Sequence, residues 1–253
     1  MRWLEQEWEK LGRRDPYFGV LSDEKFRAAR LDAAARAEFF ASGERHVATC
    51  FETIRRCLAP AFAPRRALDF GCGVGRLVIP LSRRCAQVVG ADVSPAMLAE
   101  ARRNCEQDGV LNVTFVETRD GLGAVTGAFD FIHSFIVFQH IPAAAGERIA
   151  GELLDRLEPG GVGALHFTTA QRASKLRVLL RRMRWAAPVL NDVANLLRGR
   201  RGEPLMIMDQ YDLGRIWSAL RERGCGHAYL RATDHGGQLG VMLFFEKRAL
   251  DPL

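Results

Sequence analysis

The sequence predicts an α/β domain built around a mostly parallel sheet with helices on both faces, and three observations predict it. From about Arg65, short apolar runs alternate with amphipathic stretches, which is the pattern of repeated strand–helix units. Gly71, Gly73 and Gly75 follow the first apolar run, where a strand would turn tightly into a helix. Residues 128–138 are apolar almost without interruption, as expected of a strand that is covered on both faces.

The first five strands and the helices between them are expected within residues 65–167. Ser94 and Pro95 begin one of these helices, because serine is a good N-cap and proline at the first helical position has no N–H to leave unsatisfied. Pro159, Gly160 and Gly161 mark the end of the helix that precedes the fifth strand. The strands are expected at 67–70, 86–92, 112–117, 128–138 and 162–167, and the helices at 76–84, 94–108 and 142–157.

The chain leaves this rhythm after the fifth strand and resumes it near residue 209. A helix is expected over 209–223, followed by two strands near 226–231 and 240–245. Two adjacent glycines, Gly236 and Gly237, lie between these strands and favour a tight turn. The last two strands are therefore expected to form an antiparallel hairpin.

Residues 65–253 are expected to form the main domain. Two segments stand apart from its sheet. Residues 1–64 are helical in pattern, with a break from Asp15 to Gly19, and are expected to form an N-terminal extension or lid. Residues 171–206 form an insertion after the fifth strand. Four aromatic side chains either close the lid over a ligand or pack the extra helices onto the core. They are Trp3, Trp8, Tyr17 and Tyr211.

The composition excludes several classes of protein. The 253 residues are 48% hydrophobic and 26% charged, which is enough to build a core without disulfides or a metal. No apolar run approaches the roughly 18 residues that a membrane-spanning helix needs, and the acidic, Trp-rich start is unlike a secretory signal. The six cysteines include no Cys-x-x-Cys pair, and no histidine cluster has metal-ligand spacing. We therefore expect a cytoplasmic protein with reduced thiols and no metal site.

The net charge of +6 is concentrated in the insertion. Residues 171–206 contain nine Arg and Lys against two acids, which leaves the rest of the chain at −1. Apolar residues recur there at helical spacing, so an amphipathic helix with a cationic face is expected. Three interpretations remain open: a solvated lid, the wall of a pocket for an anionic or lipid-linked substrate, or a helix in peripheral contact with the inner membrane surface.

An acidic residue precedes the glycine loop. Asp69 stands two residues before Gly71, and the glycines have the spacing Gly-x-Gly-x-Gly rather than the Gly-x-Gly-x-x-Gly of dinucleotide sites. A carboxylate at this position would repel a pyrophosphate but attract an ammonium group. The implied ligand therefore carries an amino-acid head.

Two further acids follow the next two strands. Asp92 closes the second strand, where its carboxylate can accept hydrogen bonds from two vicinal ribose hydroxyls. Asp120 follows the third strand, where an acid can accept a hydrogen bond from the adenine amine. Each acid alone is also explained as a helix cap. Together with the glycine loop, however, they occupy three successive strand ends along the edge where open α/β sheets bind ligands.

With these residues, the sequence resembles the class I S-adenosylmethionine-dependent methyltransferases. The resemblance covers roughly residues 60–170 and 207–247. It implies a Rossmann-like sheet of seven strands in the order 3-2-1-4-5-7-6, with strand 7 antiparallel. The motifs that carry it are LDFGCGVGRL at 68–77, VVGADVSPAMLAEAR at 88–102, FDFIHSFIVFQHIP at 129–142 and LEPGGVGALHF at 157–167.

The resemblance also implies where the cofactor S-adenosylmethionine lies. The glycine loop and its acid would surround the methionine part, the acid after the second strand would bind the ribose, and the acid after the third would lie near the adenine. Gln139, after the fourth strand, either contacts the cofactor, polarises a substrate or is a simple polar cap. The expected cofactor-binding residues are Asp69, Gly71, Gly73, Gly75, Asp92, Asp120 and Gln139.

Histidine is the usual general base near neutral pH, and several histidines stand near strand ends. His140 follows the fourth strand, where an acceptor would meet the methyl group, and is the first candidate base. Its alternative is a helix-entry residue that is bonded to the backbone. His166, near the end of the fifth strand, is the weaker candidate and is otherwise a core histidine. His133 is expected to be structural, and His235 has no assigned role.

These features predict an enzyme that methylates a small-molecule acceptor such as a sugar, a natural product or a lipid-linked intermediate. Transfer to oxygen is favoured, with transfer to nitrogen close behind. No nucleic-acid partner is expected, because the Asp/Asn-Pro-Pro-aromatic run of base-methylating relatives is replaced by residues 134–138. The alternatives are a non-catalytic partner or membrane adaptor that keeps the fold, and a dehydrogenase. The oligomeric state is not predicted.

Overall fold

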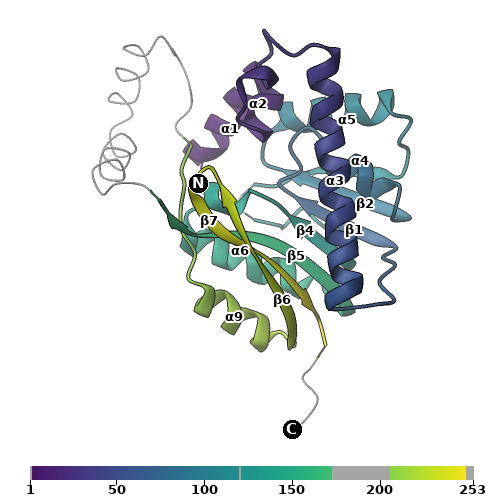
Figure 1. The fold of residues 1–253 in the computed structure, drawn as a ribbon, viewed down its shortest axis with the longest axis vertical. Helices are drawn as coiled ribbons and strands as arrows, with labels where there is room; N and C mark the ends of the chain where they lie inside the picture. The colour runs from purple at the N-terminus through teal and green to yellow at the C-terminus, as the bar shows by residue number, and fades with distance from the viewer. Residues whose placement is uncertain (1, 120, 173–205, 249–253) are drawn as a thin grey trace.

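The computed structural model describes residues 2–119, 121–172 and 206–248, which form the expected α/β fold (Figure 1). Seven strands are hydrogen-bonded in the order β3-β2-β1-β4-β5-β7-β6. β7 is antiparallel to both β5 and β6, and the other pairs are parallel, so the predicted order and direction are confirmed. The strands are β1 (Arg66–Phe70), β2 (Gln87–Asp92), β3 (Val113–Glu117), β4 (Phe129–Ser134), β5 (Leu157–Gln171), β6 (His227–His235) and β7 (Gln238–Glu246).

Helices cover both faces of the sheet. α3, α4 and α5 pack on one face, and α6 and α9 pack on the other, each layer enclosing a separate hydrophobic cluster. α1 and α2 lie next to α5 (Figure 1). The helices are α1 (Arg2–Arg14), α2 (Pro16–Val20), α3 (Ala33–Cys57), α4 (Val78–Ser82), α5 (Pro95–Gln107), α6 (Ala143–Asp155) and α9 (Leu213–Glu222), with short 3-10 helices η1 (Glu24–Phe26) and η2 (Phe138–His140).

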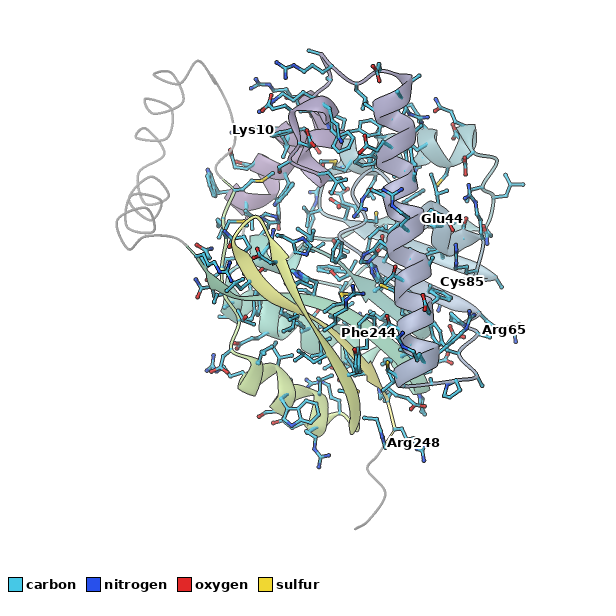
Figure 2. The ribbon with its side chains drawn as sticks, viewed as in Figure 1. Lys10, Glu44, Arg65, Cys85, Phe244 and Arg248 are labelled. Carbon is cyan, nitrogen blue, oxygen red and sulfur yellow. The ribbon has the colours of Figure 1, made fainter. Side chains whose placement is uncertain are left out.

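The central strands are apolar on both faces because each face carries its own core. In β7, Leu243 and Phe245 lie in the cluster under α6 and α9. Met242 and Phe244 alternate with them and lie in the cluster under α3 and α4. Figure 2 labels Phe244 on the side of the sheet that α3 crosses. The nearly continuous apolar runs of the sequence therefore mark buried strands, as predicted.

The fourth strand is shorter than predicted. β4 ends at Ser134, although the apolar run continues to Phe138. Ile136 has a φ of 61°, in the left-handed region that β-branched residues rarely adopt, so the chain turns there instead of extending the strand. Phe135, Ile136 and Val137 line a cavity, which explains why apolar residues continue after the strand has ended.

The C-terminal hairpin is confirmed. Gly236 and Gly237 have φ values of 63° and 85°, and a tight turn of this kind requires positive φ at both central residues. β6 and β7 pair antiparallel from this turn. Of the basic insertion, residues 173–205 lie outside the described residues, so the amphipathic helix expected there stays a prediction. Within the described ranges, no helix is long and apolar enough to cross a membrane.

The N-terminal extension is continuous with the core. Val47, Phe51 and Ile54 of α3 belong to the same cluster as the buried residues of β1 and β2. Tyr17 of α2 and Phe39 of α3 form a further cluster together with Val74 and Met97. The extension is therefore packed on the strand–helix units that carry the glycine loop.

Gly43 allows α3 to approach the glycine-loop segment closely. A Cβ at this position would lie 2.2 Å from the carbonyl oxygen of Arg76. Gly→Ala normally stabilises a helix by about 1 kcal/mol, but here we expect Gly43→Ala to lower the free energy of unfolding by about 1–3 kcal/mol, because backbone must move. Chemical denaturation measures this change. Gly151→Ala in α6 is the matched control, since its Cβ would meet only the flexible Arg223 side chain. Equal losses in both variants would contradict the steric explanation.

Candidate active site

A cavity of about 420 Å³ lies at the carboxyl edge of the parallel strands. This is the edge at which open α/β sheets bind ligands, and the volume is in the range of small-molecule sites. Residues from the ends of β1, β2, β3 and β4, from α1 and α2 and from the segment before α9 surround it. Its lining includes Glu5, Trp8, Val20, Phe70, Gly71, Gly73, Asp92, Met97, Thr118, Phe135, Ile136, Gln139, His140, Met206, Met208 and His235.

The glycine loop lines the cavity with backbone. Gly71 and Gly73 have φ values of 74° and 52°, which side chains other than glycine tolerate poorly. A Cβ on Gly71 would lie 2.3 Å from Val137, and one on Gly73 would lie 2.6 Å from Val20. Gly75 differs, because it faces Ala101 of α5 and is not among the residues that line the cavity. The first two glycines therefore keep the cavity open, whereas the third is required by its φ of 85° and not by close packing.

Asp92 connects the loop with the next strand end. Its Oδ2 accepts a hydrogen bond from the Gly73 N–H at 2.9 Å, and its Oδ1 accepts one from the Ser94 N–H at 2.9 Å. Burial raises the pKa of Asp92 to about 6, against the lowering effect of these backbone hydrogen bonds. Each carboxylate oxygen retains further accepting capacity, and Asp92 lines the cavity. The geometry is suited to a pair of ligand hydroxyls.

Asp69 lies away from the cavity. Its side chain is buried, with 1% of the residue exposed, and its Oδ1 lies 2.8 Å from Nδ1 of His133. The structure thus joins Asp69 to a histidine of β4 and does not place it among the cavity-lining residues. Asp120 lies outside the described residues, so its expected position near adenine stays a prediction.

His140 and Gln139 lie side by side in η2 and line the cavity. His140 Nδ1 is 2.8 Å from the carbonyl oxygen of Ile207, so Nδ1 carries the hydrogen and Nε2 is the basic nitrogen. Gln139 Nε2 lies 3.1 Å from that basic nitrogen, and Gln139 Oε1 accepts a hydrogen bond from Thr168. Burial lowers the pKa of His140 to about 4, so its imidazole is neutral at pH 7.

The other two histidines near the cavity have different surroundings. His166 Nε2 lies 2.9 Å from the hydroxyl of Thr233, and burial lowers the pKa of His166 to about 3. His166 is fully buried and is not among the cavity-lining residues. His235 does line the cavity, with its ring 5.4 Å from that of Phe135. The structure therefore brings His140 and His235 to the cavity, whereas His166 occupies the core position that was its alternative interpretation.

Helix α1 covers the cavity. Trp8 lines it and packs edge-on against the His140 ring at 5.1 Å. Glu9 Oε2 accepts hydrogen bonds from the hydroxyl of Ser94 at 2.7 Å and from the N–H of Ala96 at 3.0 Å. α1 is thereby held at the N-terminus of α5, directly after Asp92.

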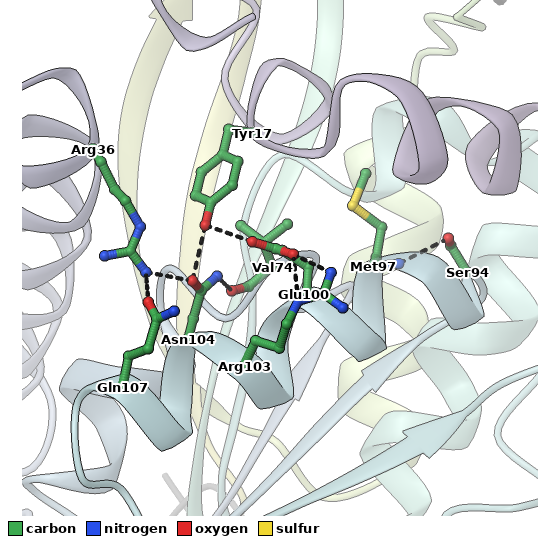
Figure 3. Close-up of polar contacts among 9 residues, drawn as sticks. All are labelled: Tyr17, Arg36, Val74, Ser94, Met97, Glu100, Arg103, Asn104 and Gln107. Carbon is green, nitrogen blue, oxygen red and sulfur yellow. Dashed lines mark hydrogen bonds and ion pairs between the residues drawn. The ribbon is translucent and has the colours of Figure 1, made fainter. Parts of the chain in front are cut away.

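The extension is tied to α5 by a polar network (Figure 3). The Tyr17 hydroxyl lies 2.8 Å from Oε1 of Glu100 and 2.8 Å from Oδ1 of Asn104. Arg36 of α3 donates to Asn104 and Gln107, both at 2.6 Å. Of the four aromatic residues predicted to close or pack the lid, only Trp8 lines the cavity, and Tyr17 packs the extra helices onto the core.

Tyr211 also packs rather than covers. It is buried in the cluster under α6 and α9, and its hydroxyl lies 2.9 Å from the carbonyl oxygens of Phe138 and Ile141. It therefore supports η2, which carries His140. Sequence spacing does not reveal this role, because Tyr211 follows the insertion and meets η2 only in the folded chain.

Several cavity residues were not predicted. Thr118 is buried at the end of β3, and its hydroxyl has no hydrogen-bond partner among the described residues. One carboxylate oxygen of Glu5 in α1 is also buried and has no hydrogen-bond partner among the described residues. Ile136 holds a strained backbone conformation, a feature that is often found at functional sites. A polar residue at a strand end was an available signal for Thr118, whereas no sequence signal marks Glu5 or Ile136.

Comparison with known proteins agrees with this geometry. Residues 67–161 match the family model of a methyltransferase domain. The demethylmenaquinone methyltransferase of Thermus thermophilus is 44% identical over 108 residues, which is 41% of this chain and 47% of that protein. The ubiquinone biosynthesis O-methyltransferase of Methylocella silvestris is 35% identical over 107 residues, 40% of this chain and 41% of the relative. Each match thus covers less than half of the relative's own length.

A solved structure extends the similarity in fold to nearly the whole chain. The magnesium protoporphyrin IX methyltransferase of Synechocystis, with bound SAH, aligns with a TM-score of 0.64 at 20% identity. The alignment covers 98% of this chain and 99% of that one. Residues 67–161 are thus similar to a methyltransferase domain, and the strand order and the glycine loop beside Asp92 agree with that match.

Proposed function

We propose that the chain is an enzyme that transfers a methyl group from S-adenosylmethionine to a small, largely apolar acceptor. The observation that carries this proposal is a cavity that is lined both by the glycine loop and Asp92 and by His140 and the aromatic residue Phe135. Methyl transfer requires the cofactor and the acceptor to meet in line, and orientation alone can contribute about 7–11 kcal/mol to lowering the barrier. A shared cavity with two chemically different sides supplies that orientation.

The cofactor side would be formed by residues of β1, β2 and β3. The Asp92 carboxylate would accept hydrogen bonds from the ribose hydroxyls, while the backbone of Gly71 and Gly73 would contact the methionine part. The Thr118 hydroxyl has no hydrogen-bond partner among the described residues and is available to the adenine part. When bound, S-adenosylmethionine supplies a methyl group on a sulfonium centre, which is the electrophile of the reaction.

The acceptor side would be formed by η2 and the segment before α9. Phe135, Met206, Met208 and His235 line it, and its surface is mainly apolar. This lining fits the rings of a quinone-like or porphyrin-like acceptor, the classes that the compared methyltransferases are named for, better than it fits a sugar. A lipid-linked ring fits the same lining.

For a hydroxyl acceptor, His140 would take the proton. Its Nδ1–H is held by the Ile207 carbonyl, so the lone pair is on Nε2, which lies 3.1 Å from the Gln139 amide nitrogen. An acceptor hydroxyl would replace the Gln139 N–H at this lone pair and give its proton to Nε2 as it takes the methyl group from the sulfonium sulfur, which would leave as the neutral thioether of S-adenosylhomocysteine. Gln139 itself is fixed by Thr168 and would remain next to the reacting oxygen.

A panel of acceptors tests the class of substrate. The chain is incubated with methyl-labelled S-adenosylmethionine and hydroquinones, catechols, glycosides and the amine analogue of the best phenol. We expect label in the phenolic compounds and little in the glycosides. Faster labelling of the amine analogue would contradict O-methylation, and labelling of the glycosides alone would contradict the apolar acceptor.

Cofactor affinity is expected to depend on pH through Asp92. Because burial raises the pKa of Asp92 to about 6, its carboxylate is ionised at pH 7.5 but mostly protonated at pH 5. The ribose hydroxyls are expected to bind only the ionised carboxylate. Lowering the pH protonates Asp92 and so reduces the fraction of the chain that can bind. We expect the Kd of S-adenosylhomocysteine to rise about tenfold between pH 7.5 and pH 5. Calorimetry at the two pH values measures this change. An unchanged Kd would show that the ionised carboxylate is not needed.

A further inference from the structure

Three potential metal ligands meet between α3 and β4, behind the wall of the cavity. His46 Nε2 and His133 Nε2 are 3.0 Å apart, and Cys50 Sγ lies 3.4 Å from His46 Nε2. One ligand atom from each of the three residues lies within 4.8 Å of the others. His133 and Cys50 are buried, whereas His46 is partly buried. The cluster therefore lies mainly in the protein interior, with His46 as its least buried member.

The fold explains how these residues meet. His46 and Cys50 are one helical turn apart on α3, so they lie on the same face of the helix. That face packs on the sheet, where His133 of β4 lies opposite Asp69 of β1 in the parallel register. The sequence predicted no metal site, because the third ligand is separated from His46 by 87 residues.

A carboxylate orients one of the histidines. Asp69 Oδ1 lies 2.8 Å from His133 Nδ1, which places the hydrogen on Nδ1 and directs the lone pair of Nε2 toward His46. Metal-binding histidines commonly have such a carboxylate behind them, since it fixes the tautomer and raises the basicity of the ligand nitrogen. Asp69 thus has a defined contact here, on the side of His133 away from His46 and Cys50.

We propose that His46, Cys50 and His133 bind one zinc ion, with water as the fourth ligand. Zn–N distances of about 2.0–2.1 Å and a Zn–S distance of about 2.3 Å put the ligand atoms of a tetrahedral site about 3.3–3.6 Å apart. The separations of 3.0 and 3.4 Å need to widen by only a few tenths of an ångström. Two imidazoles and a thiolate favour zinc over magnesium or calcium.

The charges around the cluster are compatible with a bound dication. Binding forms a Zn–S bond and releases the thiol proton of Cys50 to solvent, so the ligand set contributes one negative charge. Asp69 contributes a second negative charge, whereas buried Arg76 contributes a positive charge that opposes binding. The His46 ring packs 3.9 Å from Phe135, which lines the cavity, so the ion would fix α3 against the acceptor wall.

Cobalt titration of the full-length chain tests the site, because a thiolate bound to Co²⁺ gives a charge-transfer absorption in the near ultraviolet. We expect the metal-free wild-type chain to bind one Co²⁺ with this absorption and to lose it when one equivalent of Zn²⁺ is added. Cys50→Ser is expected to abolish the absorption. Two matched controls, Cys105→Ser at another buried thiol and Cys57→Ser at the exposed thiol, are expected to retain it.

If a variant fails to fold, the charge-transfer absorption of the wild-type chain alone tests whether the metal site exists. Absence of the absorption in the folded wild-type chain would mean that the three side chains form only a hydrogen-bonded chain, and would overturn the proposal. Retention of the absorption in Cys50→Ser, or its loss in Cys57→Ser alone, would place the metal elsewhere and overturn it equally. This test does not use methyl transfer, so its outcome is separate from that of the proposed function.

Discussion

Asp92→Ala is expected to weaken binding of S-adenosylhomocysteine by at least about 100-fold. In the proposed site the variant would remove two hydrogen bonds from ribose hydroxyls to an ionised carboxylate, and each is worth about 1.5–3 kcal/mol. It also leaves the Gly73 and Ser94 N–H groups without their acceptor, so the loop loses the contact that connects it with β2. Calorimetric titration of the folded variant measures the change.

Asp155→Ala is the matched control for this experiment. Asp155 is an exposed acid at the end of α6 that pairs with Arg223, outside the cavity. Its replacement is expected to leave the Kd of S-adenosylhomocysteine within about twofold, since exposed ion pairs contribute little. An Asp92→Ala chain that is folded and binds with wild-type affinity would contradict the assignment of the ribose site.

His140→Ala is expected to lower turnover by about 10²–10⁴-fold, the usual contribution of a general base. The affinity for S-adenosylhomocysteine should remain near that of the wild type, because His140 is proposed to contact the acceptor and not the cofactor. His227→Ala, at the start of β6 and away from the cavity, is the matched control and is expected to retain turnover. Full activity of His140→Ala would remove His140 as the base.

The pH profile tests whether His140 or another group takes the proton. Since burial lowers the pKa of His140 to about 4, its imidazole stays neutral well below pH 7. Wild-type turnover at saturating cofactor is therefore expected to show no loss from this group between pH 7 and pH 5.5. A decline centred near pH 6.5 under these conditions would assign the proton transfer to a different group of the enzyme or of the acceptor.

Most of the fold could be predicted from the sequence because strand and helix periodicities differ and because glycine and proline mark the turns. The length of β4 could not be predicted, because the apolar residues after Ser134 have the pattern of a continuing strand but line a cavity. Their backbone turns at Ile136, whose positive φ no sequence pattern predicts. Apolar character alone does not distinguish a buried strand from the wall of a ligand site.

The candidate site was predictable where its residues follow a strand directly. Gly71, Gly73 and Asp92 lie in the cavity for that reason. Asp69 also lies near the end of a strand, but its contact with His133 depends on the register between β1 and β4. The cluster of His46, Cys50 and His133 depends in addition on how α3 packs on the sheet, which local spacing does not determine.

Methyl transfer by the wild-type chain, with Asp92→Ala alongside it, tests the central claim most directly. Both proteins are incubated with methyl-labelled S-adenosylmethionine and a small-molecule extract that contains quinols. We expect label in an organic-soluble product with the wild type and at least about 100-fold less with the variant at low cofactor concentration. A wild-type chain that binds S-adenosylhomocysteine but transfers no label to any acceptor would contradict the enzymatic function and identify a binding protein instead.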